Sequence, residues 1–210
     1  NGMRLIFLLL ICITLQGNSM DLISHIKDRE GVVYASYPDS LKKPTGGVGH
    51  LLTQEEQLLY PIKYVNGKPI GTPIPRDVVN NWLEQDLAVA KKAAIEQSSQ
   101  LSSPATQEFE NALVSVNFQL GTKWTTKFPT AWKHLKSGSY NKAIQEIKFA
   151  DPTNKPDMPS DWYKQTKTRV NDFEEAIIKF RDGVQAQTYN KSEVINTANN
   201  NKLFEWWNNK

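Results

Sequence analysis

The sequence is poor in the residues that most often build disulfides and metal sites. It has a single cysteine, Cys12, among 210 residues, which excludes an internal disulfide framework and any site made of several cysteines. The three histidines are His25, His50 and His134, and no two of them have the i, i+4 spacing of metal ligands on one helix. We therefore expect no metal and no other cofactor.

A strong excess of charge is also missing. The formal net charge is +3, which is too small to predict nucleic-acid binding. It would suit an anionic polymer such as a bacterial cell wall, although many proteins without such a partner carry a similar charge. The apolar and charged fractions, 39% and 22%, are those of a globular protein. The length suits one domain or two small lobes.

The one conspicuous apolar run is short for a transmembrane helix. Leu5–Leu15 follows Arg4 and has eleven residues, whereas a membrane span needs roughly 20. A short apolar run behind a basic residue is typical of a signal peptide. We interpret residues 1–18 as a signal-like segment or membrane tether, with transient inner-membrane contact through residues 4–15. The alternative is a buried helix of the fold.

The front of the chain mixes a short helix with strands and turns. Apolar spacing predicts a helix from near Met20, capped by Ser19, to Gly31. The β-branched, aromatic and glycine content of Val32–Tyr37 and Thr45–Leu52 predicts two strands. The sequence thus begins with a small region of strands and turns.

Helical periodicity dominates the remainder. The expected elements are helices over Thr53–Tyr60, Arg76–Gln97, Ser103–Leu120, Pro129–Leu135, Tyr140–Phe149 and Asp161–Phe180, an Asn-Gly hairpin within Val65–Pro75, and a loop over Asp151–Ser160. The fold class is therefore α+β and mainly helical. A domain over residues 20–183 has an N-lobe at about 30–75, a connector helix at about 76–97 and an all-helical C-lobe at about 98–183. Sites often lie in the cleft between two such lobes.

A polar extension, residues 184–210, follows this domain. It ends in an aromatic cluster, Leu203–Trp207. We expect this cluster to dock on the domain and close its core. Contact with glycan or membrane is the alternative, because exposed tryptophan pairs mark such surfaces.

The stretch EGVVYASYPDSLKKPTGGVGH places two carboxylates and a hydroxyl close together. Glu30 falls four residues after Ile26, on the apolar face at the helix end, and both features disfavour a charged carboxylate. Asp39 lies in a polar turn, where it stays ionised, and Thr45 follows it. Glycoside hydrolysis uses two carboxyl groups in unlike environments, one that donates a proton and one that is ionised and acts on water or on the sugar. Pairs at this spacing are also common on surfaces, so an ordinary hairpin is the alternative.

The same residues resemble the phage-type lysozymes of glycoside hydrolase family 24. Glu30, Asp39 nine residues later, Thr45 six after that, and GVGH at 47–50 match the order of the family motif. Similarity continues in order through WLEQDLAVA (82–90), NFQLG (117–121) and WYKQTKTRV (162–170), and covers about residues 20–183. An ordered set of this kind is far more specific than a lone glycine motif.

The resemblance implies a role for each matching position. Glu30 corresponds to the general acid, Asp39 to the carboxylate that holds the hydrolytic water, and Thr45 to the residue that helps to place that water. Leu51 and Phe118 match positions that contact the saccharide. The chemistry implied is inversion at the anomeric carbon, which requires carboxyl groups roughly 6.5–9.5 Å apart.

Three further positions match supporting residues of the family. Arg169 corresponds to an arginine that pairs with the catalytic glutamate, and its charge opposes the effect of the apolar helix end on Glu30. His50 and Asp86 correspond to an ion pair between the small lobe and the connector helix. We interpret His50 as structural, not as a catalytic base, because the acid and base roles are already filled.

The chain departs from the family pattern around Asp39. Lys42 stands where a glycine is usual, Gly46 stands where an apolar residue is common, and Ala131 replaces an expected serine. The changes at Lys42 and Gly46 predict an altered path for the loop that carries Asp39, whereas Ala131 lies at a position that lines the cleft. Contacts with saccharide in segments 61–75 and 151–160 cannot be carried over.

The resemblance implies a muramidase that cleaves peptidoglycan and lyses bacteria. From the apolar run Leu5–Leu15 we expect export to the cell envelope, and we expect a monomer. The host cytoplasm, with release through a holin, is the alternative location. The other functional hypotheses are a toxin or effector with the same domain, a lytic transglycosylase, which needs only one catalytic acid, and a binding module without activity, since fold does not fix function.

Overall fold

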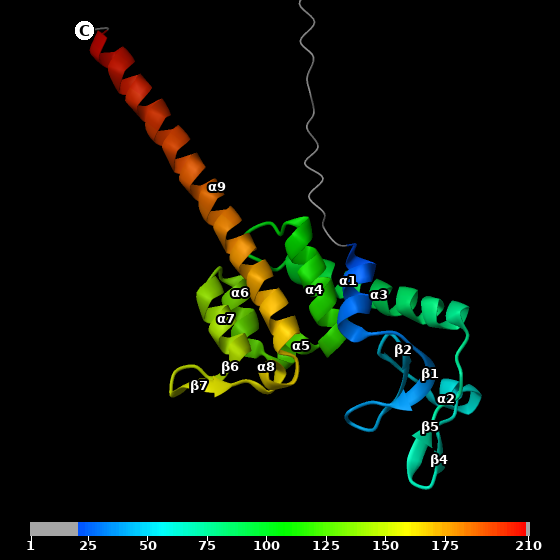
Figure 1. Cartoon of the computed structure of the whole chain (residues 1–210). Coiled ribbons are helices and arrows are strands. Elements are labelled where there is room, and N and C mark those ends of the chain that lie inside the picture. Colours follow the sequence, from blue (N-terminus) through cyan, green and yellow to red (C-terminus); the bar gives the residue numbers. More distant parts are fainter. Residues whose placement is uncertain (1–20, 209–210) are drawn as a thin grey trace, which may run out of the picture.

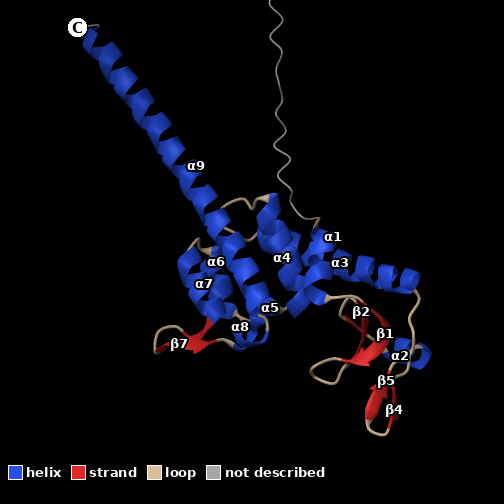
Figure 2. Ribbon diagram, viewed as in Figure 1, coloured by secondary structure: helices blue, strands red, loops and turns tan. Residues whose placement is uncertain are grey.

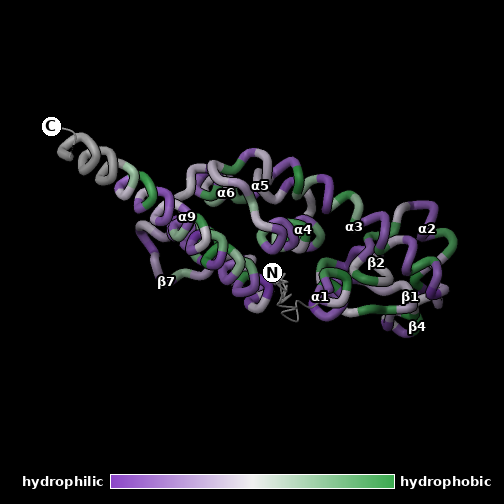
Figure 3. Tube along the Cα trace, turned by 90° about the horizontal axis from the view of Figure 1, so that it is seen from above, coloured by the Kyte–Doolittle hydropathy of each residue, from purple (hydrophilic) through white to green (hydrophobic). Residues whose placement is uncertain are grey.

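The computed structural model describes residues 21–208, and the side chains of residues 21–198. The three-stranded sheet and a small hairpin lie at one end of the long helix α3, and most helices gather at its other end (Figure 1). Seen from above, α1 lies between the helical part with α4 and α9 and the strands β1 and β2 (Figure 3). This is the expected α+β, mainly helical fold.

The sheet begins directly after the first helix. Helix α1, Leu22–Glu30, leads through Gly31 into β1, Val33–Pro38. Strands β2, Pro44–Gly47, and β3, His50–Leu51, complete an antiparallel sheet of order β1-β2-β3. The expected helix start at Ser19 and Met20 lies outside the described residues, where the first helical residue is Leu22.

Two small elements complete this lobe. Helix α2, Gln54–Leu59, begins with a capping box, because Thr53 accepts from the amide of Glu56 and the Glu56 side chain accepts from the amide of Thr53. Strands β4, Lys63–Val65, and β5, Lys68–Ile70, form the hairpin predicted from Asn-Gly.

The connector helix is confirmed. Helix α3, Arg76–Ser98, buries Trp82 and Leu83 against the small lobe and Ala90 and Ala94 in the core. Close contact with the sheet depends on Gly46, where an added Cβ would lie only 2.6 Å from Cδ1 of Ile74. A side chain there would force the end of the Ile74 side chain to move and would contact Cζ3 of Trp82 on α3, 3.5 Å away.

The helical lobe packs around aromatic side chains. Its helices are α4, Gln107–Leu120; α5, Trp124–Lys127; α6, Pro129–Lys136; α7, Tyr140–Lys148; α8, Asp161–Gln165; and α9, Lys167–Asn208. Trp124 is fully buried and its indole N–H donates to Oε1 of Gln97, 3.3 Å away. Gln97 and Asn117 also exchange two buried hydrogen bonds. This satisfied polar network ties α3 to α4.

The prediction of an all-helical C-lobe was wrong at one segment. Instead of a loop over Asp151–Ser160, strands β6, Phe149–Asp151, and β7, Lys155–Pro159, form a hairpin (Figure 2). Its turn closes where Oδ1 of Asp151 accepts from the amide of Asn154. Prolines are tolerated because both strands are edges.

Two predicted helix boundaries were also wrong. Helix α4 begins at Gln107 and not at Ser103, since Thr106 is the residue whose side chain caps it, accepting from the amide of Phe109. The predicted helix Asp161–Phe180 is broken at Thr166, whose φ is −141°. The Thr166 hydroxyl bonds to Gln119 and to the carbonyl of Trp162, which competes with continued helix.

Beyond the body, α9 continues through Gly183 as one long helix that runs away from the other elements (Figure 1). The side chains from Gln185 to Ala198 are all exposed. The side chains of Leu203–Trp207, for which docking was expected, lie outside those described. Within residues 21–208, no helix combines the length and apolar character needed to cross a bilayer. The apolar run Leu5–Leu15 lies outside this range.

Candidate active site

Glu30 lies where the small lobe meets the helical one. It is the last residue of α1, and its side chain is 21% exposed. Its Oε1 accepts a 2.7 Å hydrogen bond from Nη1 of Arg169. On the other side lies Gly49, at the turn between β2 and β3, where an added Cβ would be 3.5 Å from Oε2. Gly49 has φ +71°, so a side chain there would also strain the backbone.

Arg169 holds this glutamate from the helical lobe. It projects from α9, is 7% exposed, and donates from Nη2 to the carbonyl and the hydroxyl of Ser115 on α4. Burial lowers the pKa of Arg169 from its ordinary value, and the neighbouring Glu30 carboxylate opposes that shift. The pair therefore ties three elements, α1, α4 and α9, to one carboxyl group.

A second ion pair fixes the same helix end. Nε of Arg29 lies 2.7 Å from Oδ2 of Asp172 on α9, and Nε2 of His25 lies 3.7 Å from the same oxygen. Burial lowers the pKa of His25, with a smaller opposing contribution from Asp172. The sequence reasoning missed this pair. Two sequence positions could have indicated it. Asp172 follows Arg169 by three residues, on the same side of α9, and Arg29 is next to Glu30, so a contact between Glu30 and Arg169 brings Arg29 close to Asp172.

The Asp39 loop is closed by the aspartate itself. Oδ1 accepts from the amides of Leu41, at 2.8 Å, and Lys43, at 2.7 Å. Lys42 has φ +61°, the left-handed conformation that favours glycine. The backbone at position 42 thus has a conformation that suits the glycine expected there. Lys42 adopts it at the cost of backbone strain. Oδ2 of Asp39 makes no hydrogen bond to any described residue.

Thr45 and Tyr37 face each other across strands β1 and β2. Thr45 is buried, and its hydroxyl donates to the carbonyl of Lys43, 3.0 Å away. Burial raises the pKa of Tyr37, and the charges of Asp39 and Glu30 raise it further. Tyr37 therefore lies in the electric field of both carboxylates. It is a site residue that the sequence reasoning missed, although it is only two residues before Asp39.

His50 joins the sheet to two helices. Its Nδ1 lies 2.8 Å from Oδ2 of Asp86 on α3, and its Nε2 lies 3.1 Å from Oε2 of Glu56 on α2. The ring stacks on Trp82 with a centroid distance of 4.5 Å. Burial alone would lower the pKa of His50, but the hydrogen bonds to Asp86 and Glu56 outweigh it, so the pKa is raised. With both ring nitrogens engaged, His50 is placed as a structural link.

This geometry predicts a pH-dependent stability contribution from His50. Because its pKa is raised in the folded state, the stabilisation is complete below the unfolded pKa, about 6.5. It is lost as pH rises through the folded value. The melting temperature of His50→Gln should therefore fall furthest below that of the wild type in mildly acidic buffer. Above neutrality the gap should narrow, and a gap independent of pH would contradict the charged ring.

The two positions expected to contact saccharide lie on different lobes. Leu51 in β3 is opposite Thr45 in the sheet and is 54% exposed. Phe118, near the end of α4, is half-buried and packs against the core. Its neighbour Gln119 accepts from the indole N–H of Trp162, 3.1 Å away. A chain of sugars held by both residues would have to contact the sheet and the helical lobe together.

Within the described part of the chain, no three His, Cys, Asp or Glu side chains cluster as metal ligands. The arrangement instead offers the Glu30 carboxyl held by Arg169, the Asp39 carboxylate with one oxygen that bonds to no described residue, and the Thr45 hydroxyl on the neighbouring strand. Such groups can donate a proton and orient a water molecule.

Comparison with family models identifies a family. Residues 27–156, more than half of the chain, match the family described as phage lysozyme. A search of curated proteins finds no matching relative.

Proposed function

Because this chain belongs to the phage lysozyme family, we propose that it is an endolysin-type muramidase. It hydrolyses the β-1,4 bond between N-acetylmuramic acid and N-acetylglucosamine in peptidoglycan, which lyses the cell. The observation that carries this proposal is Glu30 at a helix end, fixed through one oxygen by the buried Arg169. No cofactor takes part.

Glu30 acts as the general acid. Arg169 engages Oε1, so Oε2, on the side of Gly49, is the oxygen that donates the proton to the leaving glycosidic oxygen. The second ion pair, Arg29–Asp172, restrains the same turn of α1 and limits movement of this carboxyl. Positioning of this kind contributes to the rate because the proton must be within hydrogen-bond reach.

Asp39 positions and activates the hydrolytic water through Oδ2. Its Oδ1 is occupied by two amides, which fix the orientation of the carboxylate. The Thr45 hydroxyl donates to the Lys43 carbonyl and keeps lone pairs with which it accepts a hydrogen bond from that water. Water attack from the face opposite the leaving group inverts the anomeric carbon. Leu51 and Phe118 contact the sugar chain.

Replacing Asp39 by asparagine should lower the rate of wall hydrolysis by about 100-fold or more. The amide oxygen of asparagine can still accept from the amides of Leu41 and Lys43, so the loop should keep its shape. What is lost is the charge on Oδ2. Clearing of chloroform-treated Gram-negative cells measures the effect. Asp157→Asn, an exposed carboxylate on β7, is the matched control. Full activity of Asp39→Asn would show that the role given to Asp39 is wrong.

We place the enzyme in the cell envelope of a bacterial host. The apolar run Leu5–Leu15 behind Arg4 supports export through the inner membrane, or a tether there before release. Peptidoglycan is the partner, nucleic acid is not, and the working form is a monomer. The mass of the protein recovered from an envelope fraction shows whether residues 1–18 are retained. Activity confined to the cytoplasm until a holin opens the membrane would contradict this placement.

A further inference from the structure

Two exposed lysines, Lys42 and Lys43, lie in the loop that carries Asp39. Among the side chains that the structure describes, neither ammonium group has a partner in an ion pair or hydrogen bond. The backbone around them is fixed, because the amide of Lys42 donates to the carbonyl of Asp39, at 2.9 Å, and the amide of Lys43 donates to Oδ1 of Asp39, at 2.7 Å. Two positive charges are therefore held beside the carboxylate that is proposed to direct water.

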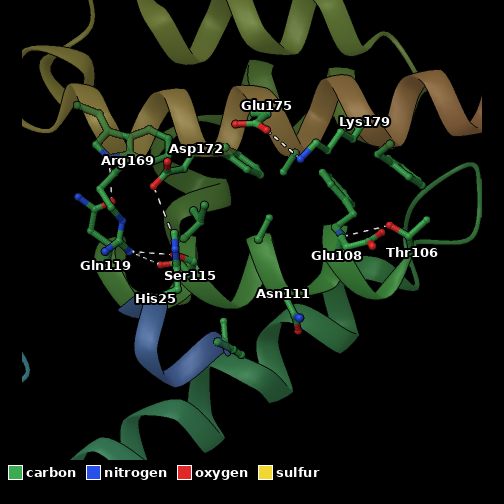
Figure 4. Close-up of a pocket in the computed structure, with 18 residues that line it drawn as sticks. His25, Thr106, Glu108, Asn111, Ser115, Gln119, Arg169, Asp172, Glu175 and Lys179 are labelled. Carbon is green, nitrogen blue, oxygen red and sulfur yellow. Dashed lines mark hydrogen bonds and ion pairs between the residues drawn. The ribbon is translucent and has the colours of Figure 1, made fainter. Parts of the chain in front are cut away.

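Cations of the helical lobe are engaged in a way that the two loop lysines are not. In the groove between α4 and α9, Arg169 donates to Ser115, and Lys179 pairs with Glu175 at 2.8 Å (Figure 4). An anion that bound to either cation would have to compete with the partner already present. At the loop lysines an anion would displace only water.

Lys42 also occupies a strained position. Its φ is +61°, a conformation that side chains other than Asn and Asp rarely adopt. The family resemblance predicts glycine there, and glycine would remove the strain. Backbone strain in folded proteins is concentrated at functional sites. A gain from the lysine side chain that offsets the strain is therefore expected.

The proposed reaction decides which part of the substrate lies beside this loop. Asp39 directs water to the anomeric carbon of N-acetylmuramic acid, so that sugar lies against the loop. The same ring carries a lactyl group and the peptide stem on its third carbon. The first free carboxylate of the stem belongs to its second residue, which can extend about 10 Å from the ring. A lysine side chain extends about 6 Å from its Cα, so the ammonium group and the carboxylate are within reach of each other.

We propose that Lys42 and Lys43 bind the free carboxylates of the peptide stem on the N-acetylmuramic acid that is cut. The enzyme would then prefer stems with ionised carboxyl groups to stems in which these groups are amidated. This is the site of the proposed function, on which the inference rests. A lysine is a point charge on a flexible stem, which suits a mobile carboxylate. Because the contacts are exposed, added salt should weaken them.

The variants are made in the full chain with Glu30→Gln, so that the substrate stays intact during binding. Lys42→Asn removes one charge and adopts the left-handed conformation more readily than lysine. Lys43→Gln removes the other charge. The matched control combines Lys63→Gln with Lys68→Asn, two exposed positions of the β4–β5 hairpin. The two double variants have the same net charge.

Three kinds of soluble, uncrosslinked peptidoglycan strand are used as probes, all with their amines acetylated. The first has free stem carboxyl groups, and the second is the same material with these groups converted to amides. The third has been stripped of its stem by an amidase and keeps only the lactyl carboxylate. Isothermal titration calorimetry gives the dissociation constant of each, so the stem and the lactyl group are distinguished as sources of the carboxylate.

We expect the variant with Lys42→Asn and Lys43→Gln to bind the strands with free stem carboxyls about tenfold more weakly than its parent. Its affinity for the amidated and stripped strands should be unchanged, and the hairpin control should match the parent on all three. Lys42→Arg should keep the affinity, because it keeps the charge. The free energy of unfolding in urea should not fall, since asparagine relieves strain at position 42.

Each other outcome would overturn the inference. The same loss in the hairpin control would indicate attraction to net charge alone. The same loss on amidated strands would show that the lysines do not recognise carboxylates, and the same loss on stripped strands would assign them to the lactyl group. A less stable Lys42→Asn protein would indicate a structural role. Binding does not require hydrolysis, so a wild type that cuts no strand would contradict the proposed function and leave this comparison intact.

Discussion

Glu30→Gln should reduce the release of new reducing ends from purified peptidoglycan by about 1,000-fold or more while leaving the fold intact. Glutamine has the same shape and can still accept from Nη1 of Arg169 through its amide oxygen. It cannot donate an acidic proton to the leaving oxygen. Glu30→Gln therefore removes the general acid and keeps the hydrogen bond with Arg169.

The control for this variant is Glu55→Gln, an exposed carboxylate in the first turn of α2. It should keep wild-type activity. Glu30→Gln should stay folded at the assay temperature with a lowered melting temperature, since the amide oxygen keeps the contact with Arg169 but the buried guanidinium loses its counter-charge. More than a tenth of the wild-type rate in a folded Glu30→Gln protein would remove Glu30 from the role of acid.

Arg169→Met should destabilise the protein by about 3 kcal/mol, measured by urea unfolding. The methionine removes the partner of a carboxylate that is only 21% exposed, and it leaves the Ser115 carbonyl and hydroxyl without their donor. Breaking one side of a buried pair is costly because the remaining charge is uncompensated. Lys91→Met, at an exposed position on α3, is the control and should change stability little.

A double-mutant cycle separates the ion pair from the packing of Arg169. The double variant Glu30→Gln with Arg169→Met should lose less stability than the sum of the two single changes, because the neutral amide needs no counter-ion. A strictly additive result would show that the two side chains do not interact in solution. A fully stable Arg169→Met protein would contradict the placement of this arginine.

Local patterns predicted much of the framework. The spacing from Ile26 to Glu30, followed by Gly31, placed the glutamate at the end of a helix. The periodic stripe of α3 and the Asn-Gly turn gave the connector helix and the β4–β5 hairpin. In these segments the local preference and the final packing agree, which is why sequence periodicity was sufficient.

Features that depend on distant partners were not predictable in the same way. Glu30 and Arg169 are separated by 139 residues, and their pairing came from family resemblance, not from periodicity. The pair of Arg29 and Asp172 was missed because its only sequence signal depends on first knowing that Glu30 and Arg169 meet. The β6–β7 hairpin was not predicted, because its prolines indicated a loop. Prolines are tolerated here because both strands are edge strands.

Lys42 stands where the resemblance predicts glycine, and its backbone has the left-handed conformation that favours glycine. A lysine at a position where glycine is usual suggested a different path for the Asp39 loop. Lys42 has φ +61°, and two hydrogen bonds to Oδ1 of Asp39 hold the loop closed. Backbone strain of the order of 1 kcal/mol is the consequence.

In the proposed function this chain hydrolyses the muramic acid bond, with Glu30 as acid and Asp39 as the residue that directs water. Mass spectrometry of the products formed from purified peptidoglycan in ¹⁸O-labelled water tests it most directly. The predicted result is a reducing N-acetylmuramic acid end that carries one ¹⁸O atom, formed by the wild type and lost in Glu30→Gln. Unlabelled anhydro-muramic ends would contradict hydrolysis and indicate a lytic transglycosylase. Binding to sacculi without any new ends would contradict catalysis altogether.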